Sequence, residues 1–296
     1  MKPTLFTGSG VALATPFDAD GIDKQRMRAQ VQRQIDLGTD ALIVLGTTGE
    51  PSTMTQEERD ECISLCVGQV QGRVPVIAGA GANDTRVSIA YARRAQRLGA
   101  DGLLVVTPYY NRPSQRGLIA HYTAIADATD LPLILYNVPS RTGTDMLPET
   151  VATLSQHPNI VALKEANGNL IQLSETINLT DGRFPIYSGN DEQVLTIMAL
   201  GGKGVISVAA NIIPDKMHQM ATRFAEGDVA GARELQLRYM KLIRLLFIEP
   251  SPAPLKAAMQ MLGLDSGRLR LPLVEVSLAN QALIRSELHR LGLLSD

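Results

Sequence analysis

The sequence predicts a (β/α)8 barrel followed by a C-terminal helical extension. Eight short apolar runs recur up to residue 208 of the 296, helical segments lie between them, and no linker interrupts the alternation. Alternating strands and helices form parallel sheets with right-handed crossovers. Eight parallel strands can close into a barrel whose interior is filled by side chains.

The predicted strands are continuously apolar, as expected for a parallel sheet that is buried on both faces. They cover residues 11–14, 41–45, 74–78, 102–106, 131–136, 160–163, 184–187 and 204–208. A doubly wound open sheet is the alternative, because strand order cannot be read from one sequence. Closure is favoured because the halves are not separated and reactive residues follow almost every strand.

Helical periodicity is clearest at residues 24–37, 56–70, 85–98 and 114–128, and Gly38 and Gly99 mark two helix ends. After residue 208 the strand signal stops. Residues 214–247, 252–262 and 274–291 read as helices, with a rigid, proline-rich bend at 249–254. We therefore expect a barrel catalytic domain at residues 1–226 and a helical extension packed on it at 227–296.

Composition excludes several classes of function. The formal net charge is −2 and both signs are mixed along the chain, which does not resemble the basic footprint of a nucleic-acid binder. The apolar runs are too short to span a bilayer, and the first residues do not resemble a signal peptide, so we expect a cytoplasmic protein. The four scattered histidines predict no metal site. Cys62 and Cys66, one helical turn apart, are interpreted as packing residues.

In such barrels the reactive groups gather at the C-terminal ends of the strands. Here these ends carry hydroxyls, phenols and one lysine, at Thr15, Ser207 and residues 46–50, 107–110, 136–137, 164–165 and 188–189. Lys164 ends an apolar strand, so burial would favour its neutral amine. A neutral amine attacks a ketone to form an imine. The plainer interpretation is a structural ion pair. Lys203 and Lys256 are poorer candidates, since the first precedes a strand and the second lies in the extension.

Three neighbours of Lys164 admit two interpretations each. Tyr136 ends the preceding strand and could transfer protons, or it could be an ordinary rim tyrosine. Arg141 could clamp a carboxylate in two-pronged fashion, or it could be a solvated loop arginine. The Gly-Thr-Thr-Gly segment at 46–49 could bind a carboxylate through hydroxyls and amides, or it could be a turn before a helix cap. The glycine-rich stretches at 79–84 and 201–204 fit neither a dinucleotide nor a cofactor phosphate, so no cofactor is expected.

Four motifs resemble the dihydrodipicolinate synthase (4-hydroxy-tetrahydrodipicolinate synthase) family, within the class I pyruvate-dependent lyases. They are Gly-Thr-Thr-Gly-Glu at 46–50, Pro-Tyr-Tyr-Asn at 108–111, Tyr-Asn-Val-Pro-Ser-Arg-Thr at 136–142 and Lys-Glu-Ala at 164–166. The resemblance runs from about residue 8 to 291. It implies a lyase that condenses pyruvate with L-aspartate 4-semialdehyde on the path to diaminopimelate and lysine, as a homotetramer without an organic cofactor.

The resemblance also assigns roles by position. Lys164 matches the imine-forming lysine, and Thr47, Tyr136 and Tyr110 match a proton relay in which Tyr110 comes from a neighbouring subunit. Thr48 matches the residue that holds the pyruvate carboxylate, and Arg141 the residue that receives the aldehyde's carboxylate. Gly189 and Ile206 match positions that line the pyruvate pocket through their main chain. These are implications of the resemblance.

Two alternatives and two departures accompany this prediction. The chain could be an N-acetylneuraminate lyase or a 2-keto-3-deoxy sugar acid aldolase, although Arg141 argues against a sugar-derived substrate, or a non-catalytic keto-acid-binding homologue. In lysine-inhibited members a cleft binds lysine. Here Asn83 and Tyr109 match that cleft, but four positions differ, which predicts absent or weak inhibition: Pro51, Gln56, Arg59 and Val87. Asn167 stands where the family usually has serine or threonine, and the sequence offers no physical account of it.

Overall fold

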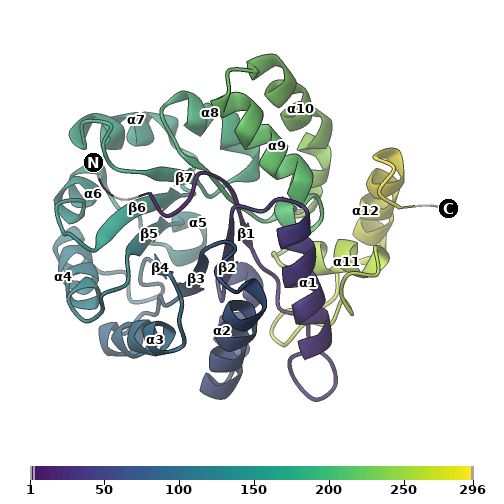
Figure 1. Ribbon diagram of the computed structural model, residues 1–296, viewed down its shortest axis with the longest axis horizontal. Coiled ribbons are helices and arrows are strands. Elements are labelled where there is room, and N and C mark those ends of the chain that lie inside the picture. Colours follow the sequence, from purple (N-terminus) through teal and green to yellow (C-terminus); the bar gives the residue numbers. More distant parts are fainter. Residues whose placement is uncertain (1, 3, 295–296) are drawn as a thin grey trace.

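The strands form a closed, all-parallel barrel in sequential order, with β8 hydrogen-bonded back to β1. This computed structural model describes residues 2 and 4–294. In Figure 1 the strands form a central ring and the helices lie outside it. The eight strands are β1 (Gly8–Ala12), β2 (Ala41–Val44), β3 (Val76–Gly79), β4 (Gly102–Val106), β5 (Leu133–Asn137), β6 (Ile160–Glu165), β7 (Ile186–Ser188) and β8 (Gly204–Ser207). The predicted fold class is confirmed, and the open-sheet alternative is wrong.

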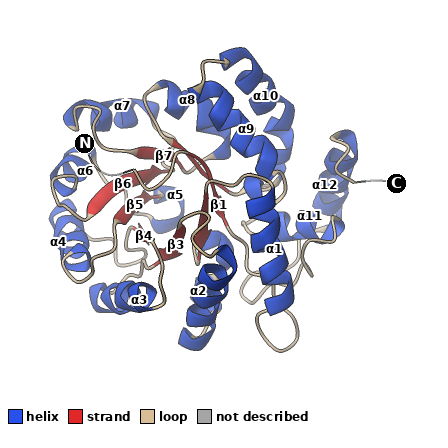
Figure 2. Cartoon of the chain, viewed as in Figure 1, coloured by secondary structure: helices blue, strands red, loops and turns tan. Residues whose placement is uncertain are grey.

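Helices cover the outside of the barrel, as the colouring of Figure 2 makes plain. They are α1 (Lys24–Asp36), α2 (Gln56–Val70), α3 (Thr85–Arg97), α4 (Gln115–Ala126), α6 (Pro148–Leu154), α7 (Leu170–Leu179), α8 (Val194–Ala199) and α9 (Pro214–Ala225). The short α5 (Pro139–Thr142) directly follows β5 and appears within the ring of strands in Figure 1. Short 3-10 turns follow three of the strands: η1 (Thr47–Gly49) and η2 (Pro51–Thr53) after β2, η3 (Asp191–Gln193) after β7, and η4 (Ala209–Asn211) after β8.

The extension consists of α10 (Val229–Leu245), α11 (Ala253–Met261) and α12 (Leu278–Arg290), which gather on one side of the barrel in Figure 1. The stretch predicted at 214–247 is helical over most of its length. It is two helices, because the chain turns at Gly227, which has a left-handed φ of 91°, and Asp228 then caps α10. The division at 226/227 stays a prediction, and this break lies at the proposed boundary.

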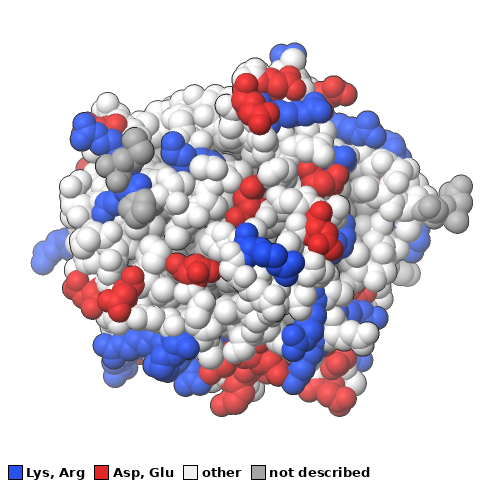
Figure 3. Space-filling model, in the orientation of Figure 1, with Lys and Arg blue, Asp and Glu red and all other residues white. Residues whose placement is uncertain are grey.

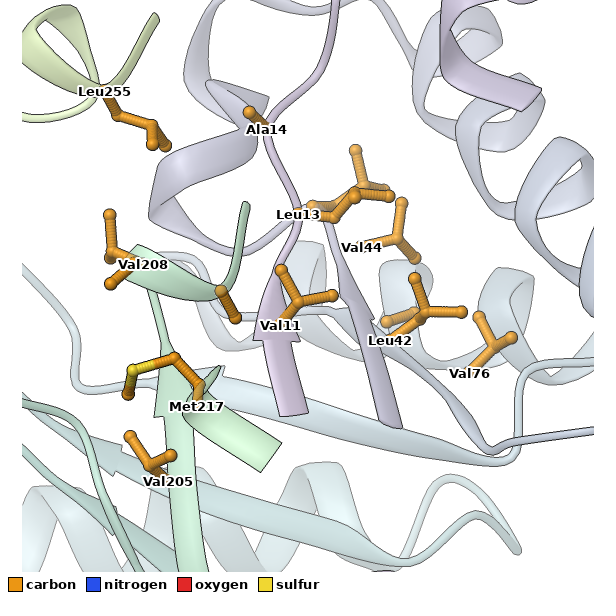
Figure 4. Close-up of a cluster of buried hydrophobic side chains, with 14 of the residues drawn as sticks. Val11, Leu13, Ala14, Leu42, Val44, Val76, Val205, Val208, Met217 and Leu255 are labelled. Carbon is orange, nitrogen blue, oxygen red and sulfur yellow. The ribbon is translucent and has the colours of Figure 1, made fainter. Parts of the chain in front are cut away.

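Side chains of the strands alternate between two apolar layers, because successive residues of a strand point to opposite faces. Ala41 and Ile43 of β2 belong to the cluster inside the barrel. Leu42 and Val44 belong to the larger cluster between the barrel and its helices, together with Cys62 and Cys66, whose burial in α2 confirms their predicted packing role. Figure 4 shows part of this outer layer, with Met217 of α9 and Leu255 of α11 beside the strands.

The join between β1 and β8 depends on glycine. Gly204 has a φ of 141°, and a Cβ atom built there would lie 1.8 Å from the carbonyl oxygen of Gly8. Gly8 itself has a φ of 103°. Only glycine permits this conformation and this approach. Backbone contact rather than side-chain packing therefore closes the ring at this point.

Candidate active site

A cavity of about 470 Å³ opens at the C-terminal ends of the strands. Six of the eight residues predicted for the site line it: Thr47, Thr48, Tyr136, Arg141, Lys164 and Gly189. Its remaining wall includes Val138, Ser140, Ala166, Asn190, Val208 and five residues after α10, namely Phe247, Ile248, Glu249, Pro250 and Ser251. One cavity therefore collects side chains from several strands and a wall from the extension.

Lys164 lies at the centre of this cavity's chemistry. It stands opposite Tyr136 in the register between β5 and β6, is 4% exposed, and its Nζ lies 4.2 Å from the centroid of the Tyr136 ring. Burial lowers the pKa of the amine to about 7, while Asp191 raises that pKa and Arg141 lowers it. A large fraction of Lys164 is therefore an uncharged nucleophile at neutral pH.

Tyr136 is suited to give and take a proton beside that amine. Its side chain is buried, which raises the pKa of the phenol, while Arg141 and a hydrogen bond with the Thr47 hydroxyl lower that pKa. Thr47 begins η1 and is itself exposed. The ring of Tyr136 thus lies against the amine, and its hydroxyl bonds to the exposed Thr47, an arrangement suited to moving protons.

Gly189 leaves the space next to Lys164 open. A Cβ at this position would lie 2.7 Å from the Cβ of Ala166 and 3.2 Å from the Cε of Lys164. The Gly189 amide donates to the carbonyl oxygen of Glu165 at 2.7 Å, which fixes β7 against β6. Thr48, in the turn η1, faces away from solvent and is only 6% exposed. The cavity thus contains the hydroxyl of Thr48 and, at Gly189, open space beside Lys164.

Arg141 stands at the mouth of the cavity. It lies in α5, directly after β5, and its Nη1 and Nη2 each lie 3.4 Å from the carbonyl oxygen of Ser251. Its side chain is otherwise exposed, so its guanidinium can donate hydrogen bonds to the carboxylate of a substrate. The long contacts to Ser251 orient the side chain toward the extension.

Two predicted residues are not in the cavity of this single chain. Ile206, in β8, is fully buried in the interior cluster and is not among the residues that line the cavity. Tyr110 is 89% exposed in the loop after β4 and has a φ of 72°. A positive φ is an outlier for a bulky residue, and such outliers concentrate at functional positions.

Sequence reasoning missed Asp191. It lies three residues past β7, is 3% exposed, and accepts the backbone amides of Val208 and Ala209 at 3.0 and 2.8 Å. Burial raises its pKa, and its charge acts on Lys164. A search extended a few residues beyond each strand would have found it. The wall at 247–251 carries no such signal, because only the tertiary fold brings the extension there.

Glu165 and Asn167 form the support behind Lys164. Burial raises the pKa of Glu165 to about 7, and its two oxygens accept from Asn137 Nδ2, each at 3.2 Å. The amide of Asn167 donates to Glu165 Oε1 at 2.8 Å, and Asn167 Oδ1 accepts the amide of Asn169, the N-cap of α7. Asn167 therefore links the end of β6 to the start of α7. A serine or threonine hydroxyl can make the same contact, so nothing in the structure explains the departure from the family pattern.

A second cavity of about 470 Å³ shares Thr47, Tyr136, Val138 and Arg141 with the first. It contains most of the positions singled out for lysine binding. Arg59 is buried there, donates to the carbonyl oxygens of Pro51 and Gly79, and its Cζ lies 3.9 Å from the centroid of the Tyr91 ring. Gln56 lies outside the lining and donates to Asp60 at 2.8 Å.

The closed barrel, with Lys164 in a cavity at the C-terminal ends of its strands, has the architecture of a (β/α)8 enzyme. The chain belongs to the dihydrodipicolinate synthetase family, whose model matches residues 5–291. This confirms the family predicted from the motifs. It is 50% identical over 293 residues to the 4-hydroxy-tetrahydrodipicolinate synthase of Thermoanaerobacter sp. (strain X514), covering 99% of each chain.

Solved structures agree with this assignment. A crystal structure of dihydrodipicolinate synthase from Thermotoga maritima superposes with a TM-score of 0.96 at 41% identity, over 98% of this chain and 100% of that one. A monomeric dihydrodipicolinate synthase variant also has a TM-score of 0.96 at 41% identity, over 98% of both chains. In residues 2 and 4–294, no helix has the length and apolar character needed to cross a membrane.

Proposed function

We propose that this chain condenses pyruvate with L-aspartate 4-semialdehyde through an imine on Lys164. The relatives at about half identity are named for 4-hydroxy-tetrahydrodipicolinate synthase activity, which agrees with the activity predicted from the motifs. The observation that carries the proposal is the amine of Lys164, buried, with its pKa lowered to about 7, beside the ring of Tyr136.

The proposed chemistry begins when the neutral amine attacks the ketone carbon of pyruvate. Water leaves, and the resulting iminium draws electrons from the adjacent methyl group, which loses a proton and becomes an enamine carbon nucleophile. That carbon then attacks the aldehyde carbon of the second substrate. Tyr136 and Thr47 move the protons, with Tyr110 supplied by a neighbouring subunit. Thr48 holds the pyruvate carboxylate, helped by the main chain at Gly189 and Ile206, and Arg141 binds the carboxylate of the aldehyde.

Borohydride trapping tests the proposal. Reduction in the presence of pyruvate should add covalent mass at Lys164, and Lys164→Ala should abolish this adduct. Lys203→Ala is the matched lysine control, because Lys203 precedes β8 at the other end of the barrel, so its adduct should equal that of the wild type. Lack of an adduct in the wild type would contradict the imine.

Turnover with different aldehydes then separates the enzymatic alternatives. We expect aspartate semialdehyde to be consumed much faster than sugar-derived aldehydes, because Arg141 offers a cation to its carboxylate at the cavity mouth. Arg141→Gln should raise KM for this aldehyde while leaving the pyruvate adduct intact. Preference of the wild type for a sugar-derived aldehyde would assign the chain to the sugar acid aldolases instead.

The proposed assembly is a homotetramer in the cytoplasm. Tyr110 supports at least a dimer, since its ring is exposed in one chain and the family resemblance assigns it to the site of a neighbouring subunit. Sedimentation of the purified chain measures the assembly. A monomer with full activity would contradict the role of Tyr110.

We also propose that lysine does not inhibit the enzyme. The second cavity holds the buried cation of Arg59 and offers Val87 where a carboxylate would face the ammonium of lysine. Burying a second cation without a partner is costly. In a steady-state assay, millimolar lysine should leave the rate unchanged. Strong inhibition below 1 mM would overturn this prediction.

A further inference from the structure

The turn that carries Thr47 and Thr48 has an unusual backbone. Leu45, two residues before Thr47, has a φ of 59°, and Glu50, the residue that ends the turn, has a φ of 55°. Both are non-glycine residues in the left-handed region, which is sparsely populated for such side chains. Conformations of this kind persist only where the surrounding structure holds them in place. The turn must therefore be fixed from outside.

A buried ion pair with the extension supplies that hold. Lys256, in the middle of α11, is fully buried, and its Nζ donates to Glu50 Oε1 and to the carbonyl oxygen of Thr15, each at 2.9 Å. Nζ also lies 4.4 Å from the centroid of the Phe17 ring. The other oxygen of Glu50 accepts the amide of Arg270 at 3.2 Å. Both oxygens of this carboxylate are thus bound by residues beyond the barrel.

Net stability does not explain why two charges are buried here. Replacing a buried ion pair by apolar residues of similar volume is often neutral or stabilising, because desolvation offsets the Coulombic attraction. Hydrogen bonds between charged groups do, however, fix the relative orientation of the two side chains. Here the Lys256 ammonium joins Glu50, the last residue of the Thr47–Glu50 turn, to Thr15, three residues after the end of β1.

We infer that Glu50 and Lys256 are positioning residues, which act on the reaction by holding the hydroxyls of Thr47 and Thr48 in place. Neither residue lines the cavity, so neither touches substrate. The inference rests on the proposed roles of those two threonines. Lys164 belongs to β6 and is held by other neighbours. Without the pair the imine should therefore still form, but more slowly, because Thr47 helps to move its protons.

The decisive test is the double variant Glu50→Gln/Lys256→Met. It leaves no unpaired buried charge, so it should fold with an unfolding free energy near that of the wild type. It should nevertheless lose roughly tenfold to a hundredfold in kcat/KM for pyruvate, since small misplacements of reacting groups have effects of about that size. Trapping at saturating pyruvate should still modify Lys164, with its pH midpoint unchanged.

Two further variants separate positioning from stability. Lys256→Met alone strands the carboxylate of Glu50 and should lower stability as well as activity. Met259→Ala opens a cavity in the same helix without touching Glu50, so it should lower stability and keep the wild-type kcat/KM. A double variant with normal kcat/KM would overturn the inference, as would an equal loss of activity in Met259→Ala. Failure of the wild type to form an adduct would instead overturn the proposed function.

Discussion

The environment of Lys164 is set by neighbours on β5 and by the segment that follows β7. Tyr136 lies beside it on β5, Gly189 leaves space for it after β7, and Asp191 opposes the loss of its proton from the following turn. Burial has the largest effect, and it favours the neutral amine. At this scale the sequence predicted the lysine and the tyrosine. It did not predict Asp191, whose importance depends on a distance that only the closed barrel sets.

The pH dependence of imine formation follows from this environment. Only the neutral amine attacks the ketone, so the rate of adduct formation should rise with pH through a midpoint near 7, the value to which burial lowers the pKa of Lys164. Stopped borohydride trapping at several pH values measures it. Lys203→Ala should show the same midpoint. A midpoint near 10 would mean that the amine is solvated.

The same pKa has a consequence for stability, with a defined sign. Between about pH 7 and 10.5 the unfolded lysine binds a proton that the folded one has lost, so the free energy of unfolding should rise with pH across this window. Lys164→Met removes this dependence. Urea unfolding of both proteins at the two ends of the window measures the difference. A wild-type curve parallel to that of Lys164→Met would contradict the lowered pKa.

Gly189→Ala should impair the site more than the fold. The added Cβ meets Ala166 Cβ at 2.7 Å, the carbonyl oxygen of Glu165 at 3.0 Å and Lys164 Cε at 3.2 Å, so the segment on both sides of the reactive lysine must shift. Overpacking of this kind costs about 1–3 kcal/mol, and the activity loss should exceed what that cost predicts. Gly68→Ala is the control. It lies within α2 with no atom within 4 Å of its added Cβ, so it should stabilise by about 0.5–1 kcal/mol. Wild-type kcat in Gly189→Ala would contradict the role of this void.

At the scale of elements, the existence of each strand was predictable and the bounds were less so. β1 begins at Gly8, whereas residues 11–14 were predicted, because its first three residues carry no apolar signal. They are held by backbone pairing with β8 and by glycine contacts. Conversely, β6 extends through Lys164 and Glu165. The prediction ends this strand at residue 163, because a polar residue after an apolar run indicates the end of a strand.

The start of α2 is stabilised by its N-cap residue, Thr55. Thr55 and Glu58 form a reciprocal capping box, in which each side chain accepts the backbone amide of the other residue. Thr55→Ala should lower the free energy of unfolding by about 1 kcal/mol, as loss of an N-cap usually does. Thr55→Ser keeps the acceptor and should be nearly neutral. Urea titration of the three proteins measures both effects, and equal losses would show that the hydroxyl is not the stabilising group.

At the scale of the whole molecule, positive and negative side chains are interspersed on the face shown in Figure 3, and neither sign forms one continuous patch there.

The exposure of Tyr110 is a feature that a single chain leaves unexplained. The proposed role of Tyr110 comes from the family resemblance, and a single chain could not have suggested that role, because the proposed site belongs to another copy.

Mixed assemblies test whether Tyr110 works across a subunit boundary. Tyr110→Phe and Lys164→Ala should each be poorly active alone. Mixed after dissociation, they should regain part of the wild-type activity, because one interface then combines an intact Lys164 with an intact Tyr110 from the other copy. A mixture made without dissociation is the control. No recovery in proven mixed assemblies would place Tyr110 outside the reaction.

The five residues after α10 that wall the cavity tie the extension to substrate choice. Their backbone also meets the guanidinium of Arg141, at Ser251. Exchanging C-terminal segments between related barrels therefore cannot be a neutral graft. Each transplanted tail would bring its own part of the binding surface, and selectivity would travel with it while the strands beneath stayed the same.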